Sequence, residues 1–132
     1  MNDAHQHSSE EDHATLKTIL VVEDDVDVGD FLVQALLLES PYQAMLVSDG
    51  FQALKTVRSL KPNLFLLDYQ LPSMNGIELY DRLHAIKELA DIPAIVFSAN
   101  LPLQKARDRK LACLKKPVEL DELLHTIEEL LT

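Results

Sequence analysis

A single acidic residue, Asp68, stands at the end of an apolar segment near the middle of the chain. Residues 63–68 read Asn-Leu-Phe-Leu-Leu-Asp, so Asp68 follows four large apolar side chains. Such a run is typical of a strand buried on both faces, where an uncompensated carboxylate costs free energy. Turn-favouring residues, Pro-Ser-Met-Asn-Gly at 72–76, follow and end the strand. The sequence therefore places a lone carboxylate at a strand tip, and a chemical role would explain it.

Side chains that can do chemistry also stand at the ends of three other apolar runs. The first run ends in Glu23-Asp24-Asp25, the fourth in Ser98, and the fifth in Lys115-Lys116-Pro117. Carboxylates gathered at one edge repel, and burial raises their pKa values. A hard divalent cation resolves this conflict, and Mg²⁺ typically binds through one or two carboxylates, waters and phosphate oxygens.

A lysine and a hydroxyl opposite such a cation could hold the other oxygens of a phosphoryl group. The residues at the four strand ends therefore predict a site in which carboxylates hold a metal, an ammonium holds a phosphoryl group, and Asp68 is the nucleophile. Each part has an ordinary alternative: an acidic cluster at a helix N-terminus, a loop hydroxyl, and a turn before the last helix. Those alternatives must explain four strand ends separately, so one shared site is the better interpretation.

The elements that position these residues alternate along the chain. Apolar runs predict strands over 18–22, 42–47, 63–67, 92–97 and 111–115. Amphipathic spacing predicts helices over 25–39, from Asp49-Gly50 onward, over 76–89 and at 120–131. The first of these has Val28, Phe31, Leu32, Ala35 and Leu38 at helical spacing, and Asn75 with Glu78 resembles a capping box for the third. This alternation predicts an α/β fold with a five-stranded parallel sheet covered on both faces, whose ligands lie at the carboxyl ends of the strands.

Length and composition narrow the class of protein. The chain has 132 residues and one cysteine, which predicts a single domain without an internal disulfide. A formal net charge of −10 argues against a nucleic-acid surface spread over the chain. Residues 1–16 hold three of the five histidines and four acids, so we expect a disordered tail there and a folded domain over 17–132. No long apolar run and no signal peptide are evident, so we expect a cytoplasmic protein.

From residue 17 to 132 the chain resembles the receiver domains of two-component response regulators. "ILVVEDD" is similar to the first strand of that family with its acidic pair, Glu23 and Asp24. "LLDYQLPSMNGIEL" matches the phospho-acceptor loop, with a proline four residues and a glycine eight residues after Asp68. "IVFSA" supplies the Ser/Thr position, Ser98, and "LKKP" supplies the lysine, Lys116, before a proline that commonly follows a cis bond.

The resemblance implies a doubly wound, flavodoxin-like sheet with strand order 2-1-3-4-5. It implies that Mg²⁺ is held by Glu23, Asp24, Asp68 and the backbone carbonyl of Gln70. Asp68 would accept a phosphoryl group from a sensor histidine kinase, a histidine phosphotransfer protein or a small phosphodonor. Lys116 and Ser98 would then bind that group, without a separate turnover activity. The side chains of Gln70 and Asn100 would stand where attacking water approaches.

Other classes with this architecture fit the residues less well. A flavin binder needs hydroxyls and glycines after the first strand, where this chain has acids, and a dinucleotide fold needs clustered glycines. An Asp-dependent phosphohydrolase commonly has an acid where Gln70 stands. A phosphorylation-independent docking module stays as the alternative. Because no DNA-binding or catalytic domain follows, we expect output through protein contact, without direct DNA or membrane binding.

The segment from Ser98 to Lys116 departs from the family. It is shorter by roughly one helical turn, and Cys113 stands where the family usually has an aromatic residue. A short or irregular fourth helix is therefore expected near Leu103 to Lys110, with Pro102 at its start. Residues 104–117 also hold six of the twelve basic residues, either as a solvated helix face or as a docking patch for an acidic partner.

Overall fold

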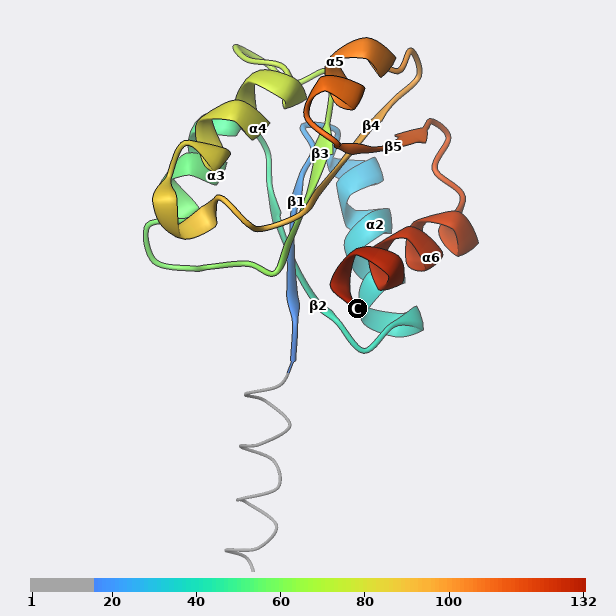
Figure 1. Cartoon of the computed structure of the whole chain (residues 1–132). Helices are drawn as coiled ribbons and strands as arrows, with labels where there is room; N and C mark the ends of the chain where they lie inside the picture. Colours follow the sequence, from blue (N-terminus) through green and yellow to red (C-terminus); the bar gives the residue numbers. More distant parts are fainter. Residues whose placement is uncertain (1–15) are drawn as a thin grey trace, which may run out of the picture.

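Five strands and their connecting helices alternate through the computed structural model, which describes residues 16–132 (Figure 1). The strands are β1 (Thr18–Val22), β2 (Gln43–Val47), β3 (Leu64–Asp68), β4 (Ala94–Ser98) and β5 (Ala112–Lys115). The helices are α2 (Val26–Glu39), α3 (Gly50–Thr56), α4 (Gly76–His84), the 3₁₀ turn η1 (Lys87–Leu89), α5 (Leu103–Asp108) and α6 (Leu120–Leu131). The predicted tail lies outside the described residues except for Leu16.

The strands form one parallel sheet in the order β2-β1-β3-β4-β5, as predicted. In the register, Val22 pairs with Leu67, Asp68 with Phe97, and Ser98 with Lys115. Because all strands run the same way, their carboxyl ends share one edge. The four predicted chemical groups therefore meet there.

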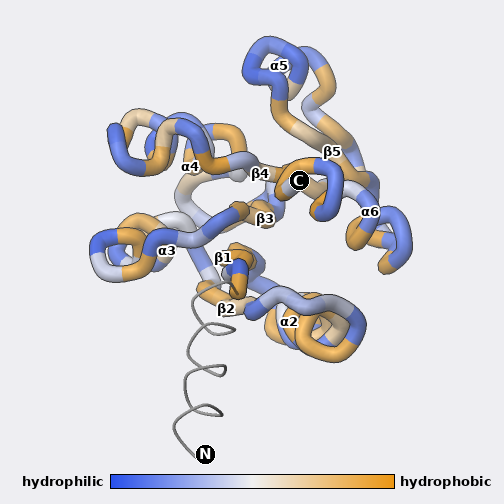
Figure 2. Tube along the Cα trace, turned by 60° about the horizontal axis from the view of Figure 1, so that its bottom comes forward, coloured by the Kyte–Doolittle hydropathy of each residue, from blue (hydrophilic) through white to orange (hydrophobic). Residues whose placement is uncertain are grey.

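Helices cover the sheet on both faces (Figure 2). Helices α2 and α6 pack on one face against a cluster that includes Ile19, Leu66 and Phe97. Helices α3, α4 and α5 pack on the other face against a cluster that includes Leu20, Phe65 and Val96. All five residues of β3 are buried, which confirms the two-sided burial expected for that strand.

Side-chain caps fix where the helices begin. Asn75 accepts a hydrogen bond from the Glu78 backbone N–H, and the Glu78 side chain accepts one from the Asn75 backbone N–H. This capping box is the predicted one, and it starts α4 directly after the loop that follows Asp68. Asp25 caps α2 in a similar way, since its side chain accepts from the backbone N–H groups of Asp27 and Val28.

The prediction of one helix over 76–89 is wrong beyond His84. The α-helix ends there, Ile86 takes an extended conformation (φ −82°, ψ 119°), and η1 follows as a single 3₁₀ turn. Apolar spacing continues through Leu89, which is 2% exposed, because the 3₁₀ turn presents that side chain to the same core. Hydrophobic periodicity therefore did not reveal the break.

Helix α2 also buries a different stripe from the one that the spacing suggests. Leu32 and Ala35 are buried as expected, together with Gly29 and Leu36. Phe31 and Leu38 are instead 57% and 78% exposed. An apolar residue every three or four positions fits several overlapping stripes, and only the packing against the sheet selects one.

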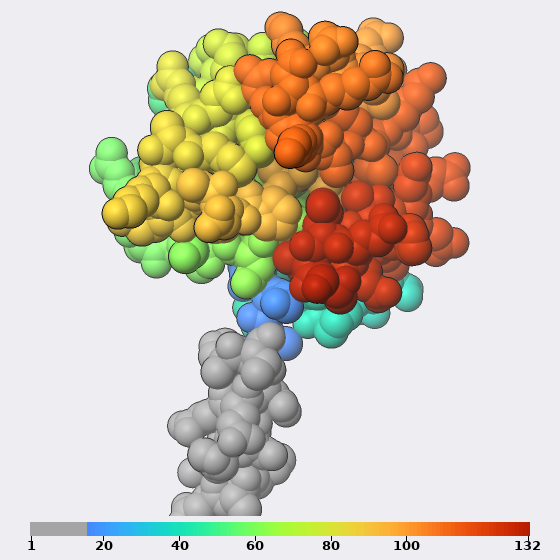
Figure 3. All heavy atoms as spheres, viewed as in Figure 1, coloured from blue at the N-terminus to red at the C-terminus, as the bar shows by residue number. Residues whose placement is uncertain are grey.

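Helix α5 is six residues long, which confirms the short fourth helix. Pro102 is the residue before its first turn rather than the first helical residue. The helix ends in a Schellman motif: the Leu111 N–H donates to the Ala106 carbonyl, and Lys110, at φ 55°, occupies the left-handed position. On the face shown in Figure 3, the surface of α5 (orange) lies above that of α6 (red).

Within residues 16–132, no helix is both long and apolar enough to span a membrane.

Candidate functional site

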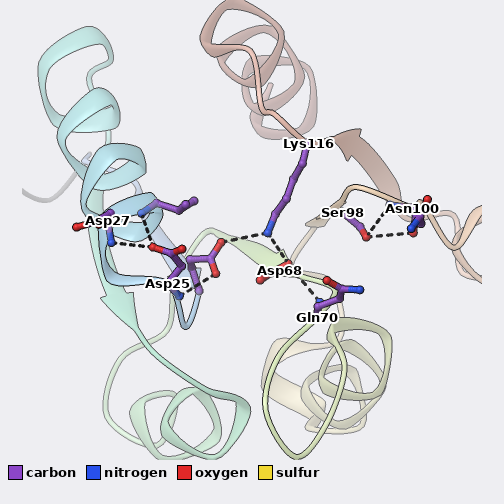
Figure 4. A network of polar contacts seen from close by, with 9 residues as sticks. Asp25, Asp27, Asp68, Gln70, Ser98, Asn100 and Lys116 are labelled. Atoms are coloured by element: carbon purple, nitrogen blue, oxygen red, sulfur yellow. Dashed lines mark hydrogen bonds and ion pairs between the residues drawn. The ribbon is translucent and has the colours of Figure 1, made fainter.

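The predicted groups lie at the carboxyl edge of the sheet. Figure 4 shows Lys116 reaching Asp68, with Gln70 beside Asp68 and Ser98 paired with Asn100. Asp68 is 2% exposed at the tip of β3. Its Oδ1 lies 3.2 Å from the Lys116 ammonium and accepts a hydrogen bond from the Gln70 backbone N–H, also at 3.2 Å. These two donors compensate the buried carboxylate and fix its orientation.

Glu23 and Asp24 come to the same point from the end of β1. Carboxylate oxygens of Glu23, Asp24 and Asp68 all lie within 4.8 Å of one another. Glu23 is 1% exposed and Asp24 is exposed, so the cluster extends from the sheet to solvent. Glu23 Oε2 accepts a hydrogen bond from the Asp25 backbone N–H at 3.1 Å, whereas the Asp25 side chain caps α2 and is not part of the cluster.

The cluster is electrostatically strained. The pKa of Glu23 is raised to about 7, mainly by burial and also by the neighbouring Asp68, while the Asp25 N–H and the Lys116 charge partly oppose the rise. Burial would lower the pKa of the Lys116 ammonium, but Asp68 and Glu23 outweigh that effect and raise it. The Lys116 ammonium therefore forms ion pairs with two buried carboxylates.

A hard cation fits this set of donors. Glu23 Oε1 is buried and accepts no hydrogen bond from the described residues, and Lys116 Nζ stands 3.5 Å away. An unsatisfied buried carboxylate oxygen is costly, and a second ligand carboxylate is within 4.8 Å. Oxygen ligands of this kind suit Mg²⁺. Gln70 lies in the loop after β3, beside Asp68, as the prediction of a carbonyl ligand requires.

Lys116 reaches the cluster from the end of β5. Its backbone N–H donates to the Ser98 carbonyl, and its ammonium lies 5.3 Å from the centre of the Phe97 ring. The Lys116-Pro117 peptide bond is cis, as the resemblance implied. The side chain is thus aimed across the strand ends at Glu23 and Asp68.

Ser98 is in place but its hydroxyl is engaged elsewhere. The side chain is 1% exposed, and Oγ donates to the Asn100 carbonyl at 3.0 Å and accepts from the Asn100 N–H at 3.2 Å. The hydroxyl therefore holds the first turn of the β4–α5 loop. Asn100 itself is exposed, and Figure 4 shows it beside Ser98.

The loop after Asp68 depends on Gly76, a role that the sequence did not reveal. The Gly76 N–H donates to the Tyr69 carbonyl at 2.8 Å. A Cβ on Gly76 would stand 2.6 Å from the Asp68 carbonyl oxygen, closer than side chains approach backbone. Gly76 therefore lets α4 start against the backbone of the acceptor residue. The sequence shows a glycine after turn-favouring residues, but only the structure shows how closely Gly76 approaches the Asp68 carbonyl.

Comparison with known proteins identifies the family. Residues 19–128 match the family model "Response regulator receiver domain". The chain belongs to the response regulator receiver domain family.

Two relatives illustrate the relationship over nearly their whole lengths. The chain is 30% identical over 119 residues to "Polar-differentiation response regulator DivK" of Brucella anthropi, covering 87% of this chain and 96% of the relative. It is 31% identical over 117 residues to "Sporulation initiation phosphotransferase F" of Bacillus subtilis, covering 86% and 92%.

A solved structure agrees with this assignment. A "response regulator receiver domain protein (CheY-like)" from Methanospirillum hungatei has a TM-score of 0.80 and 29% identity, covering 89% of this chain and 94% of that one. The flavodoxin-like receiver fold and the family expected from the sequence are therefore confirmed, and the phosphorylation-independent docking module is not favoured.

Proposed function

We propose that this receiver domain accepts a phosphoryl group on Asp68 and signals through protein contact. The observation that carries the proposal is the convergence of three carboxylates and one ammonium at the tips of β1, β3 and β5. A structural ion pair needs one acid for one base. Two buried acids and a third exposed acid around Lys116 are an excess that a metal and a phosphoryl group would balance.

In this mechanism Glu23, Asp24, Asp68 and the Gln70 carbonyl would hold Mg²⁺, whose charge would neutralise the carboxylates and the phosphoryl oxygens. An Asp68 carboxylate oxygen attacks phosphorus, and a P–O bond forms as the P–N bond of a phosphohistidine breaks. The electron pair of that bond stays on the departing imidazole. The Gln70 N–H and Lys116 orient the carboxylate for attack, since both donate to Oδ1.

After transfer, Lys116 pairs with the phosphoryl oxygens, because its ammonium is already at hydrogen-bond distance from the acceptor. Ser98 donates its hydroxyl to the same group. To do so it must leave the Asn100 carbonyl, while Oγ can still accept from the Asn100 N–H, so the first turn of the β4–α5 loop would be drawn toward the site. Phosphorylation of Asp68 would thus change the position of α5 through the Ser98 hydroxyl.

The phosphodonor is a sensor histidine kinase or a histidine phosphotransfer protein, and the phosphorylated domain contacts a downstream protein. Support comes from the family and from the relative named as a phosphotransferase. The domain performs its own phosphorylation from a donor without a further turnover reaction. We place it in the cytoplasm, where such donors and Mg²⁺ are present, with residues 17–132 as the receiver domain and 1–16 as a tail.

The test is phosphorylation by a small phosphodonor such as phosphoramidate with Mg²⁺, followed by intact mass measurement. The wild-type protein should gain one phosphoryl group that is lost at alkaline pH, as expected for an acyl phosphate. Asp68→Asn should gain none, because an amide is not a nucleophilic carboxylate. Asp91→Asn, which changes an exposed acid outside the site, is the matched control and should label like wild type.

Excess chelator should suppress labelling, since the carboxylate cluster would then repel the phosphodonor. Stoichiometric labelling of Asp68→Asn, or full labelling of the wild type in chelator, would contradict the proposal.

A further inference from the structure

A concave region lies at the opposite edge of the sheet from Asp68. It is a cleft of about 660 Å³ between the end of α3, with the turn that leads to β3, and the connection between α4 and β4. Leu54, Val57, Leu60, Ile86 and Leu89 supply its apolar lining. None of its lining residues belongs to the phosphoryl site.

The cleft exists because both neighbouring helices stop early. Helix α3 ends at Thr56 and α4 at His84, after which Ile86 is extended and η1 makes one turn. Leu89 is buried at 2% exposed, while Leu54, Val57 and Ile86 are only partly buried against the same core. Apolar side chains thus remain open to solvent between the two chain segments.

Two cations stand at this cleft without a partner. Arg58 and Lys61 are exposed, and neither makes an ion pair within the part of the chain that the structure describes. Glu88 is the one acid of the lining, so the cleft carries a local positive charge in a chain with a net charge of −10. An anionic group would therefore be attracted here and repelled over most of the remaining surface.

We propose that this cleft binds a small amphipathic anion, with an aromatic or acyl body and a single carboxylate or sulfonate. The apolar side chains would take the body and Arg58 with Lys61 the anionic group, since charge-assisted hydrogen bonds to such groups are strong. The volume is within the range of roughly 300–1,000 Å³ usual for ligand sites. A free small molecule is favoured over a lipid surface, because an anionic bilayer would face the net negative charge of the whole domain.

The probes are 1-anilinonaphthalene-8-sulfonate and its neutral analogue N-phenyl-1-naphthylamine, followed by fluorescence and by amide chemical shifts of the full chain. The sulfonate should bind saturably and shift the amides of 54–61 and 86–89. The double variant Arg58→Gln with Lys61→Gln should weaken sulfonate binding by about tenfold, the scale of one charge-assisted contact. Binding of the neutral analogue should stay within about twofold, because it depends on the apolar lining.

The matched control is Lys105→Gln with Arg107→Gln, which makes the same charge change on exposed residues of α5. It should leave both probes unaffected. An equal loss of sulfonate binding in this control would overturn the proposal. So would shifts confined to Phe31, Val118 and Lys116, which line a separate groove of about 610 Å³ beside the phosphoryl site.

Vesicles of phosphatidylglycerol and phosphatidylcholine test whether the cleft instead binds the anionic headgroup of a lipid. No co-sedimentation is expected. Vesicle binding that depends on Arg58 and Lys61, without binding of the free sulfonate, would contradict the proposal. Because these readouts do not involve phosphate transfer, they are independent of the outcome at Asp68.

Discussion

Glu23 shows how one buried side chain links the site to stability. Its Oε1 accepts no hydrogen bond from the described residues, and burial raises its pKa from 4.5 to about 7. A carboxyl group whose pKa is higher in the folded state holds its proton more tightly there than in the unfolded chain. The stabilisation is fully present below about pH 4.5 and is lost as pH rises through about 7.

We therefore expect the free energy of unfolding of the metal-free protein to fall between these two pH values because of Glu23. Glu23→Gln should remove this part of the pH dependence, since an amide does not titrate. Urea unfolding in chelator across this range measures it, with the exposed Glu88→Gln as the matched control. Parallel pH profiles for wild type and Glu23→Gln would contradict the assignment.

At the scale of elements, Gly76 joins the acceptor strand to α4. Gly76→Ala would place a methyl group 2.6 Å from the Asp68 carbonyl oxygen, where only backbone movement can make room. We expect it to destabilise the protein by about 1–3 kcal/mol and to slow phosphorylation, because the movement displaces the acceptor. Chemical denaturation and the labelling rate measure the two effects.

Gly50→Ala is the control for this substitution. Its added methyl group would meet the side chain of Met74, at 2.7 Å, which can rotate away. A smaller loss of stability with normal labelling is expected. If both variants behaved alike, close backbone approach would not be the reason for glycine at 76.

Helix α5 is the element that a change at Ser98 would affect most. It has six residues, no side-chain cap at its N-terminus and one buried residue, Ala106. Its far end is tied to α4 by Arg109, whose Nε and Nη2 donate to the two carboxylate oxygens of Asp81 at 2.7 Å each. This ion pair holds the pKa of Asp81 below its usual value. The near end depends on the loop that the Ser98 hydroxyl holds.

We predict that a phosphoryl mimic, beryllium fluoride with Mg²⁺, slows amide exchange mainly in residues 99–112. The reason is that Ser98 turning to the phosphoryl group would pull the loop tight against the site, and Cys113 has no ring to rotate inward. Hydrogen exchange with and without the mimic measures this, with α6 as the internal reference. An α5 already protected and unchanged by the mimic would contradict it.

At the scale of the whole molecule, metal binding and folding are linked. Mg²⁺ held by the carboxylate cluster binds the native state and should raise the melting temperature. Asp68→Asn should stabilise the metal-free protein by about 1 kcal/mol, because it removes one charge from the crowded cluster. Thermal unfolding with chelator and with millimolar Mg²⁺ tests both. Equal melting temperatures of the wild type in the two conditions would argue against a metal site.

The sequence predicted the parallel sheet and the chemical groups at its carboxyl edge, because apolar runs and the side chains at their ends are local features. The strand order followed from the family resemblance. The sequence did not predict where α4 ends, since Leu89 stays apolar and buried after the chain leaves the helix. Nor did it predict the pair between Asp81 and Arg109, which are 28 residues apart and meet only after folding. The engagement of the Ser98 hydroxyl by Asn100 depends on loop geometry that spacing does not encode.

The central claim is that Asp68 itself becomes an acyl phosphate, and chemical trapping tests it most directly. Borohydride reduces an acyl phosphate to an alcohol, which would convert a phosphorylated aspartate to homoserine. After treatment with phosphoramidate and Mg²⁺, peptide sequencing by mass spectrometry should find homoserine at position 68 and aspartate or glutamate unchanged at 23, 24 and 25. Homoserine at another position, or unmodified Asp68 in a protein that has gained phosphate, would contradict the account.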